Sequence, residues 1–237
     1  MMNTFELKKR YETVQENILK ACQRANRDRG SVCLIAVSKT KPVEMMQTFY
    51  ELGQRDFGEN HVQEILAKSA VFPEATYHMI GHLQTNKVRQ VVGKVALIHS
   101  VDSVHLAQAI SKESVKKGIV SRILLEINAG NEESKYGFAF EEAMDAAREI
   151  ALLPNLKTEG LMCVAPNVAD PEENRTVFRK MRQLSVDIGQ QNWDNISMNV
   201  LSMGMTNDYE VAIEEGATHV RIGTALFGHR DYGGIQK

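Results

Sequence analysis

The sequence is short of cysteine and has no long apolar run. Its three cysteines, Cys22, Cys33 and Cys163, show neither C-x-x-C nor Cys/His ligand spacing, which argues against a disulfide framework and against a zinc site. No segment approaches the roughly 18 apolar residues that a membrane-spanning helix needs, and the first residues lack the apolar core of a secretory signal. We therefore expect a soluble cytoplasmic protein with reduced thiols and no membrane partner.

The chain also lacks an excess of either charge. Its 30 acidic and 28 basic residues give a net charge of −2, which offers no general reason to expect nucleic acid as a partner. With 237 residues, 43% of them hydrophobic, the chain is long enough for one large core. No linker or low-complexity tract divides it, so we expect a single domain over residues 1–237.

Short apolar segments alternate with helical segments along the chain. The predicted strands are Val32–Lys39, Asp56–Asn60, Thr76–Gly81, Leu97–Val101, Arg122–Asn128, Thr158–Val164, Ile196–Met203 and His219–Phe227. A long amphipathic helix, with Thr4 as its expected N-cap, precedes them, and helices are predicted at Val43–Leu52 and His61–Ser69. Eight strands alternating with helices predict an α/β fold, a (β/α)8 TIM barrel with an extra N-terminal helix; a doubly wound open sheet is the less favoured alternative.

Lys39 closes an otherwise buried strand. Burial disfavours the ammonium form, so a lysine at the mouth of such a strand is a better amine nucleophile, and Schiff-base formation with an aldehyde is its usual use. The alternative interpretation is a lysine whose amine simply reaches solvent past the end of the strand.

Polar residues stand at the carboxyl ends of the predicted strands, where barrels of this kind carry their ligand sites. The loops after the last two strands, Ser202–Thr206 and Arg221–Thr224, supply glycine backbone, hydroxyl groups and a following helix. These are the features that hold a phosphate group. The alternative is that Thr206 only caps a helix, with Asp208 in its first turn.

Arg221 and two histidines have more than one interpretation. A guanidinium inside a barrel mouth needs a partner, which is either a buried carboxylate such as Glu59 or a ligand nitrogen or phosphate oxygen. His78 and His82 lack the spacing of metal ligands, and we expect them to be hydrogen-bonded structural residues. We expect no metal.

Several segments carry a family resemblance. They are Ala36–Pro42, Phe57–Glu64, His78–Lys87, Leu201–Met205 and Val220–Thr224. Over essentially its whole length the chain resembles the pyridoxal phosphate homeostasis protein family, whose barrel is similar to the N-terminal domain of alanine racemase. The resemblance implies pyridoxal 5'-phosphate (PLP) as the cofactor, held as a Schiff base on Lys39.

The resemblance also implies the other cofactor contacts. Asn60 would lie near the ring, Arg221 would face the pyridine nitrogen, and Ser202, Gly204, Gly223 and Thr224 would hold the phosphate. Because arginine does not give up its proton, the ring nitrogen would stay unprotonated, which makes the cofactor a weaker electron sink.

The chain departs from the racemase pattern. The racemase takes its second base, a tyrosine, from a C-terminal β domain that we do not find here. Its Arg-x-Gly segment appears as Lys135-Tyr136-Gly137, and its histidine on the sixth strand has no equivalent in Leu161–Val164. We expect a non-catalytic, monomeric PLP carrier that maintains vitamin B6 levels and passes the cofactor to apo-enzymes. The alternatives are a weak PLP-dependent racemase-like enzyme and a phosphate-binding Schiff-base aldolase.

Overall fold

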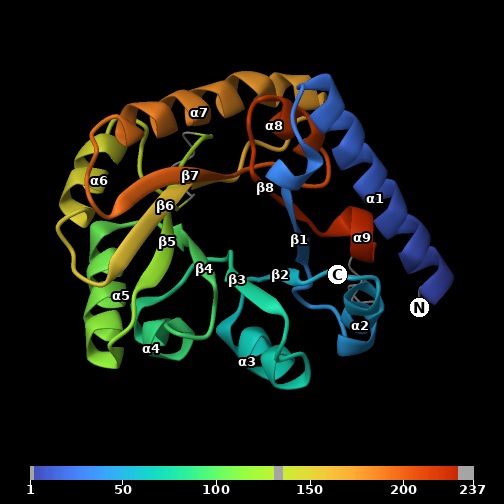
Figure 1. The fold of residues 1–237 in the computed structure, drawn as a ribbon, viewed down its shortest axis with the longest axis horizontal. Helices are drawn as coiled ribbons and strands as arrows, with labels where there is room; N and C mark the ends of the chain where they lie inside the picture. Colours follow the sequence, from blue (N-terminus) through green and yellow to red (C-terminus); the bar gives the residue numbers. More distant parts are fainter. Residues whose placement is uncertain (1–2, 131–135, 229–237) are drawn as a thin grey trace, which may run out of the picture.

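The computed structural model describes residues 3–130 and 136–228 of the chain. Its parallel strands form a closed barrel in chain order, in which β8 pairs with β1 (Figure 1). The strands are β1 (Cys33–Val37), β2 (Asp56–Glu59), β3 (Thr76–Met79), β4 (Leu97–Val101), β5 (Ser121–Ile127), β6 (Leu156–Cys163), β7 (Ile196–Ser202) and β8 (His219–Ile222). The predicted (β/α)8 barrel is confirmed.

Helices surround the barrel. They are α1 (Thr4–Arg24), α2 (Val43–Glu51), α3 (Val62–Val71), α4 (Val88–Val91), α5 (Val104–Lys117), α6 (Ala143–Ile150), α7 (Arg175–Gly189), α8 (Tyr209–Glu214) and α9 (Thr224–Phe227). The extra N-terminal helix, α1, lies along one flank of the barrel and packs against α2, α8 and α9 (Figure 1).

The α1 helix forms because its apolar residues share one face. Leu7, Val14 and Ile18 recur at helical spacing and are buried against the barrel. The expected N-cap, Thr4, is wrong by one residue: Asn3 caps the helix, and its Oδ1 accepts a hydrogen bond of 2.8 Å from the backbone nitrogen of Glu6. Both residue types cap helices well, because a side-chain oxygen of either can accept a hydrogen bond from a backbone N–H of the first turn.

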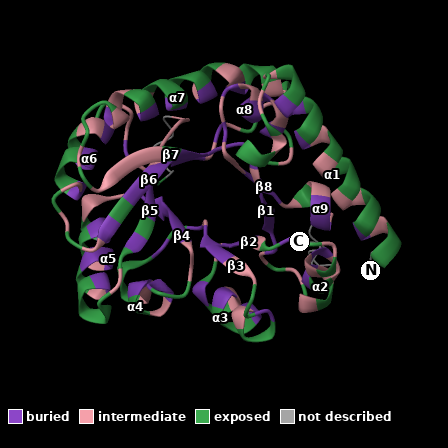
Figure 2. Ribbon diagram, in the orientation of Figure 1, coloured by how far each residue is buried: buried purple, intermediate pink, exposed green. Residues whose placement is uncertain are grey.

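The strands are buried on both faces. Figure 2 shows the ring of strands mostly buried, while the outward faces of the helices are exposed. All five residues of β4 are buried, as is expected when side chains fill the barrel inside and helices cover it outside. This double burial explains why a strand such as β1 (Cys33–Val37) is apolar along its whole length instead of alternating.

Every strand except β4 ends one or more residues earlier than predicted, and the differences at β8 and β1 bear on the site. β8 stops at Ile222, because Gly223 leaves the extended conformation (φ −109°, ψ −73°) and the next residues form α9. The predicted continuation to Phe227 is therefore wrong. β1 stops at Val37, so Lys39 lies in the turn that follows the strand.

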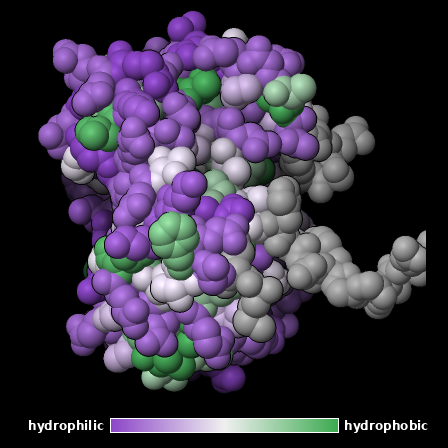
Figure 3. Space-filling model, turned by 90° about the vertical axis from the view of Figure 1, so that its right-hand side faces the viewer, coloured by the Kyte–Doolittle hydropathy of each residue, from purple (hydrophilic) through white to green (hydrophobic). Residues whose placement is uncertain are grey.

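None of the helices in residues 3–130 and 136–228 is both long and apolar enough to cross a bilayer. Figure 3 shows that one side of the molecule is mainly hydrophilic, with apolar side chains in small separate groups.

Candidate functional site

A cavity of about 440 Å³ opens where several strands end. Its volume falls within the range of about 300–1,000 Å³ that is typical of small-molecule sites. The lining residues are Val37, Lys39, Asn60, Ile80, Val164, Pro166, Asn167, Val168, Pro171, Asn174, Met205, Thr206, Asn207, Asp208, Arg221, Gly223 and Thr224. They come from the carboxyl-terminal parts of β1 and β8 and from the segments that follow β1, β2, β3, β6, β7 and β8, as the fold predicts.

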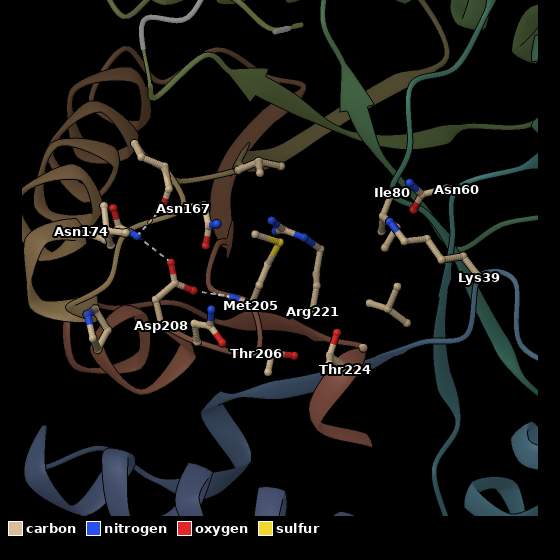
Figure 4. A pocket seen from close by; sticks show the side chains of 17 residues that line it. Lys39, Asn60, Ile80, Asn167, Asn174, Met205, Thr206, Asp208, Arg221 and Thr224 are labelled. Atoms are coloured by element: carbon tan, nitrogen blue, oxygen red, sulfur yellow. Dashed lines mark hydrogen bonds between the residues drawn. The ribbon is translucent and has the colours of Figure 1, made fainter. Parts of the chain in front are cut away.

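Lys39 enters this cavity from the turn after β1. Its side chain is half-buried, and Figure 4 shows it extending inward beside Asn60 and Ile80, on the side opposite Asp208. The following residue, Thr40, has a left-handed backbone (φ 60°), which is uncommon for a β-branched side chain and needs support from its surroundings. That support comes from a buried cluster of charged groups behind the turn.

A buried ion pair holds the residue before Lys39. The Nζ of Lys68 donates to Oε1 of Glu59 and to the carbonyl oxygen of Ser38, each at 2.7 Å. The hydroxyl of Ser38 donates to the same Oε1 at 2.5 Å. The exposed fractions of the Lys68 and Glu59 side chains are 5% and 0%. Burial raises the pKa of the Glu59 carboxyl, while Lys68 and Ser38 oppose the rise.

The residue after Lys39 is held by the same cluster. The backbone nitrogen of Thr40 donates to Oε1 of Glu64 at 2.7 Å. Lys68 lies 3.4 Å from that oxygen, so a single ammonium group stabilises the contacts on both sides of Lys39. We call Glu59, Glu64 and Lys68 the lysine-turn clamp.

Arg221 lies across the cavity and carries a buried guanidinium. Its Nη1 donates to the carbonyl oxygen and the hydroxyl of Ser202, at 2.6 and 2.7 Å, and its Nη2 donates to the carbonyl oxygen of Cys163 at 2.7 Å. No carboxylate of the described residues forms an ion pair with it. The alternative that paired Arg221 with Glu59 is wrong, because Lys68 occupies that carboxylate.

Arg221 has N–H groups that can still donate hydrogen bonds to a ligand in the cavity. Burial raises the pKa of the Glu126 carboxyl to about 7, Asp102 adds to the rise and Arg221 opposes it. The nearby carboxyl therefore titrates in the neutral range. After the contacts to Ser202 and Cys163, the N–H of Nε and one N–H of Nη2 have no protein acceptor among the described residues. The donor set fits a ligand with a ring nitrogen or an anionic oxygen.

The loop after β7 forms the wall opposite Lys39. Asp208 accepts hydrogen bonds from the backbone nitrogen of Met205 at 2.7 Å and from the Nδ2 of Asn174 at 2.9 Å. The hydroxyl of Thr206 accepts from the backbone nitrogen of Ala225 at 3.2 Å. Thr206 therefore joins this loop to α9, and it is Asp208 that precedes α8.

Ser202 and Gly204 lie behind the cavity wall. Ser202 is fully buried, and its hydroxyl contacts Arg221 and the Nδ1 of His99, the latter at 2.9 Å. Gly204 has φ +92°, and a Cβ there would lie 2.6 Å from the Cβ of Ala212. Both residues shape the wall, whereas Gly223 and Thr224 lie on its surface.

His78 and His82 make hydrogen bonds within the protein, as expected. His78 contacts Asp56 and His99, and His82 contacts Asp102. No group of three or more ligating side chains in the described parts of the chain could hold a metal ion.

Comparison with known proteins identifies the family. Residues 10–231 match the family model for the N-terminal domain of alanine racemase. The chain is 46% identical over 225 residues to the pyridoxal phosphate homeostasis protein of Aquifex aeolicus, covering 94% of this chain and 98% of that protein. It is 40% identical over 230 residues to the protein of the same name from Pseudomonas aeruginosa, covering 93% and 97%. The chain belongs to the pyridoxal phosphate homeostasis protein family.

A solved structure supports the same assignment. PipY from Synechococcus elongatus, determined with PLP bound, superimposes with a TM-score of 0.78 at 34% sequence identity, covering 91% of this chain and 100% of that chain. The family resemblance seen in the sequence is thereby confirmed.

The structure brings together most of the residues that the sequence singled out. Lys39, Asn60, Arg221, Gly223 and Thr224 line the cavity. Sequence reasoning missed Asn167 and Asn174, which follow β6 in a segment without a recognisable motif. Lys135 lies outside the described residues. In place of a histidine on β6, the backbone carbonyl of Cys163 contacts Arg221.

Gly81 sets the position of Asn60. A Cβ on Gly81 would lie 2.6 Å from the Cα of Asn60 and 2.7 Å from its carbonyl oxygen. We expect Gly81→Ala to shift that backbone and to lower the free energy of unfolding by about 1–3 kcal/mol, as measured by urea titration. Gly189→Ala is the control, because its Cβ would meet Met198 at 3.6 Å, an ordinary contact. Equal stability of the two variants would show that Gly81 is not required.

Proposed function

We propose that this chain binds PLP in the cavity and holds it through a covalent bond to the Nζ of Lys39. The observation that carries the proposal is that an amine, Lys39, and a buried guanidinium without a carboxylate partner in the described structure, Arg221, line the same cavity. Membership of the pyridoxal phosphate homeostasis protein family and the PLP-bound structure of PipY support it.

Each cavity residue has a role in this proposal. When bound, the cofactor supplies an aldehyde that reacts reversibly with a primary amine. Lys39 provides that amine, and Asn60 lies beside it. Arg221 donates a hydrogen bond to the ring nitrogen and keeps it unprotonated, because a guanidinium does not give up its proton. Gly223 and Thr224 contact the phosphate at the cavity surface, while Ser202 and Gly204 support that wall from behind.

We further propose that the protein carries the cofactor without catalytic turnover. Racemisation needs a base on each face of the substrate, and Lys39 is the only amine among the described residues that line the cavity. The one carboxylate there, Asp208, is occupied by Met205 and Asn174. Reversible bonding to Lys39 suits a protein that buffers vitamin B6 and passes the cofactor to apo-enzymes.

We also propose a compartment and an oligomeric state for this carrier. The three cysteines are free thiols, which fits a reducing compartment such as the cytoplasm. We propose that the protein acts there as a monomer, because Lys39, Arg221, Gly223 and Thr224 already supply the amine, the ring contact and the phosphate contacts that the cofactor needs.

The experiment that tests this function separates a carrier from an enzyme. The PLP-loaded protein is incubated with excess L-alanine, and D-alanine is measured over many hours. In parallel, it is mixed with an apo-enzyme that needs PLP. We expect recovery of the apo-enzyme's activity without D-alanine above the level of free PLP. Sustained D-alanine formation would instead favour the racemase-like alternative, and failure to take up PLP would favour the aldolase alternative.

We expect Arg221→Ala to weaken cofactor retention and to change the visible absorption of the bound cofactor. The variant removes the donor that keeps the ring nitrogen unprotonated, so the spectrum should become dependent on pH near neutrality. Absorption spectra of the loaded variant between pH 6 and 9, with equilibrium dialysis for retention, measure both effects. A spectrum and an affinity equal to those of the wild type would contradict the contact.

A further inference from the structure

Three histidines from three strands meet inside the barrel. The ring centroids of His78, on β3, and His99, on β4, are 5.1 Å apart, and each lies 6.2 Å from that of His219, on β8. His99 is fully buried and the exposed fraction of His78 is 4%. Buried imidazoles without a metal need hydrogen-bond partners, and the roles assigned above to the cavity residues leave this cluster unused.

Two of these histidines belong to a chain of hydrogen bonds that leads to the cavity. Nε2 of His78 lies 3.1 Å from Oδ1 of Asp56, and its Nδ1 lies 2.9 Å from Nε2 of His99. Nδ1 of His99 lies 2.9 Å from the hydroxyl of Ser202, which in turn accepts from Arg221 at 2.7 Å. The chain thus runs from the first residue of β2, through the barrel interior, to the guanidinium that lines the cavity.

Asp56 and Arg221, at the two ends of this series of hydrogen bonds, fix which atom donates in each bond. Arginine only donates and an ionised carboxylate only accepts. With neutral imidazoles, Ser202 then donates to His99, His99 donates through Nε2 to His78, and His78 donates through Nε2 to Asp56. In the opposite direction an unprotonated nitrogen of His78 would face the carboxylate of Asp56. Both histidines are therefore assigned as the Nε2–H tautomer.

Burial and the surrounding charges keep two of the three histidines, His99 and His219, neutral. Burial is the largest cause that holds the pKa of His99 well below its usual value, and the positive charge of Arg221 acts in the same direction. Burial, and then His78, lower the pKa of His219 to about 4; Arg122 acts in the same direction, and Asp56 and Glu159 oppose it.

Asp56 stays ionised at the far end of the chain. Burial alone would raise its pKa, but hydrogen bonds from His78 and Cys33 lower it below its ordinary value. The side chain is still about one-third exposed, at 34%, so the chain begins at a solvent-accessible carboxylate and ends at the cavity.

We propose that Asp56, His78, His99 and Ser202 are positioning residues for Arg221. Their one-way hydrogen bonds fix the Ser202 hydroxyl as an acceptor for Nη1, and this keeps the remaining N–H groups of Arg221 directed at the ligand. The inference rests on the proposed function, since the ligand that Arg221 faces is the ring of PLP. Asp56, at the opposite end of the barrel strands, thereby influences cofactor retention without touching the cofactor.

The tautomers can be observed without the cofactor. The full chain is labelled with ¹⁵N-histidine, and His78→Gln and His99→Gln variants assign the signals. At pH 7.5 we expect both residues to carry their proton on Nε2. A proton on Nδ1 of either residue, or an imidazolium, would overturn the proposed series of hydrogen bonds.

A matched pair of variants tests the link to the cavity. Asp56→Asn removes the acceptor-only end of the chain, and we expect roughly tenfold weaker PLP retention together with a changed pH dependence of the visible absorption. Glu159→Gln is the control, because Glu159 is a buried carboxylate that pairs with Arg122 outside the chain. We expect its retention to stay within about twofold of the wild type. Equal effects of the two variants, or none in Asp56→Asn, would overturn the positioning role.

The two experiments separate the inference from the function on which it rests. If the wild type takes up no PLP, the proposed function fails. The histidine tautomers then still decide whether the series of hydrogen bonds from Asp56 to Arg221 exists. If the wild type binds PLP and Asp56→Asn binds it equally well, only the positioning role fails. Should Asp56→Asn not fold, Ser202→Ala with the same two readouts replaces it, and an unchanged spectrum and retention would again overturn the role.

Discussion

Lys39→Ala is expected to abolish covalent capture of PLP. The variant removes the amine that enters the cavity and leaves Arg221, Gly223 and Thr224 in place. Noncovalent binding should therefore persist at much lower affinity, because the ring and phosphate contacts remain. Borohydride reduction followed by intact-mass measurement reports the covalent fraction, which we expect to fall to background.

Lys41→Ala is the matched control for this variant. Lys41 is two residues further along the same turn, but its Nζ donates to the carbonyl oxygens of Phe227 and Gly228 at 3.1 and 3.3 Å. It should retain covalent capture. A reduced adduct on another lysine in Lys39→Ala, in an amount similar to that of the wild type, would contradict the assignment of Lys39.

We expect Lys68→Met to be the most destabilising change in the lysine-turn clamp. It leaves the carboxylate of Glu59 buried without its cation, and Oε2 of Glu59 already has no hydrogen-bond partner among the described residues. Breaking a buried pair in this way costs about 3–5 kcal/mol. Urea unfolding should show this loss, and covalent capture by Lys39 should become slower because both flanking backbone contacts are weakened.

The loss in Lys68→Met should depend on pH in a defined direction. Without Lys68, the pKa of Glu59 in the folded protein rises further above its ordinary value of 4.5. At Glu59 the folded state then binds more protons than the unfolded state, so the contribution of this group to the free energy of unfolding is most favourable in acid and falls as the pH rises. The difference from the wild type should be larger at pH 8 than at pH 5. A constant difference would show that the carboxylate of Glu59 is not the cause.

Lys20→Met provides a comparison at an exposed pair. Lys20 lies 2.7 Å from Glu16 on the outer face of α1, and both side chains are more than half exposed. Solvent screens such pairs, so this variant should unfold at nearly the same urea concentration as the wild type. A loss as large as that of Lys68→Met would contradict the buried clamp.

The barrel could be predicted from the sequence because each strand is covered on both sides. Continuous apolar runs such as Cys33–Val37 are easily recognised, and their alternation with helices leaves few arrangements. The ends of the elements were harder to predict. Thr224–Phe227 is apolar enough for a strand or a short helix, and only the backbone turn at Gly223 decides between them.

The cavity residues were predictable where they follow a strand, and their partners were not. Lys39 and Arg221 stand at strand ends, so the fold alone brings them to one place. Whether Glu59 pairs with Arg221 or with Lys68 depends on which side chains meet across the barrel and its helices, and sequence spacing does not contain that information. The series of hydrogen bonds that links Asp56, His78, His99 and Ser202 was missed for the same reason, because its members come from separate strands.

The most direct test of PLP binding at Lys39 is a titration of the purified wild type with PLP, followed by borohydride reduction and peptide mass mapping. We predict a saturable visible absorption band and a single modified peptide that contains Lys39. No uptake of PLP, or modification mainly at another lysine, would contradict the proposed site.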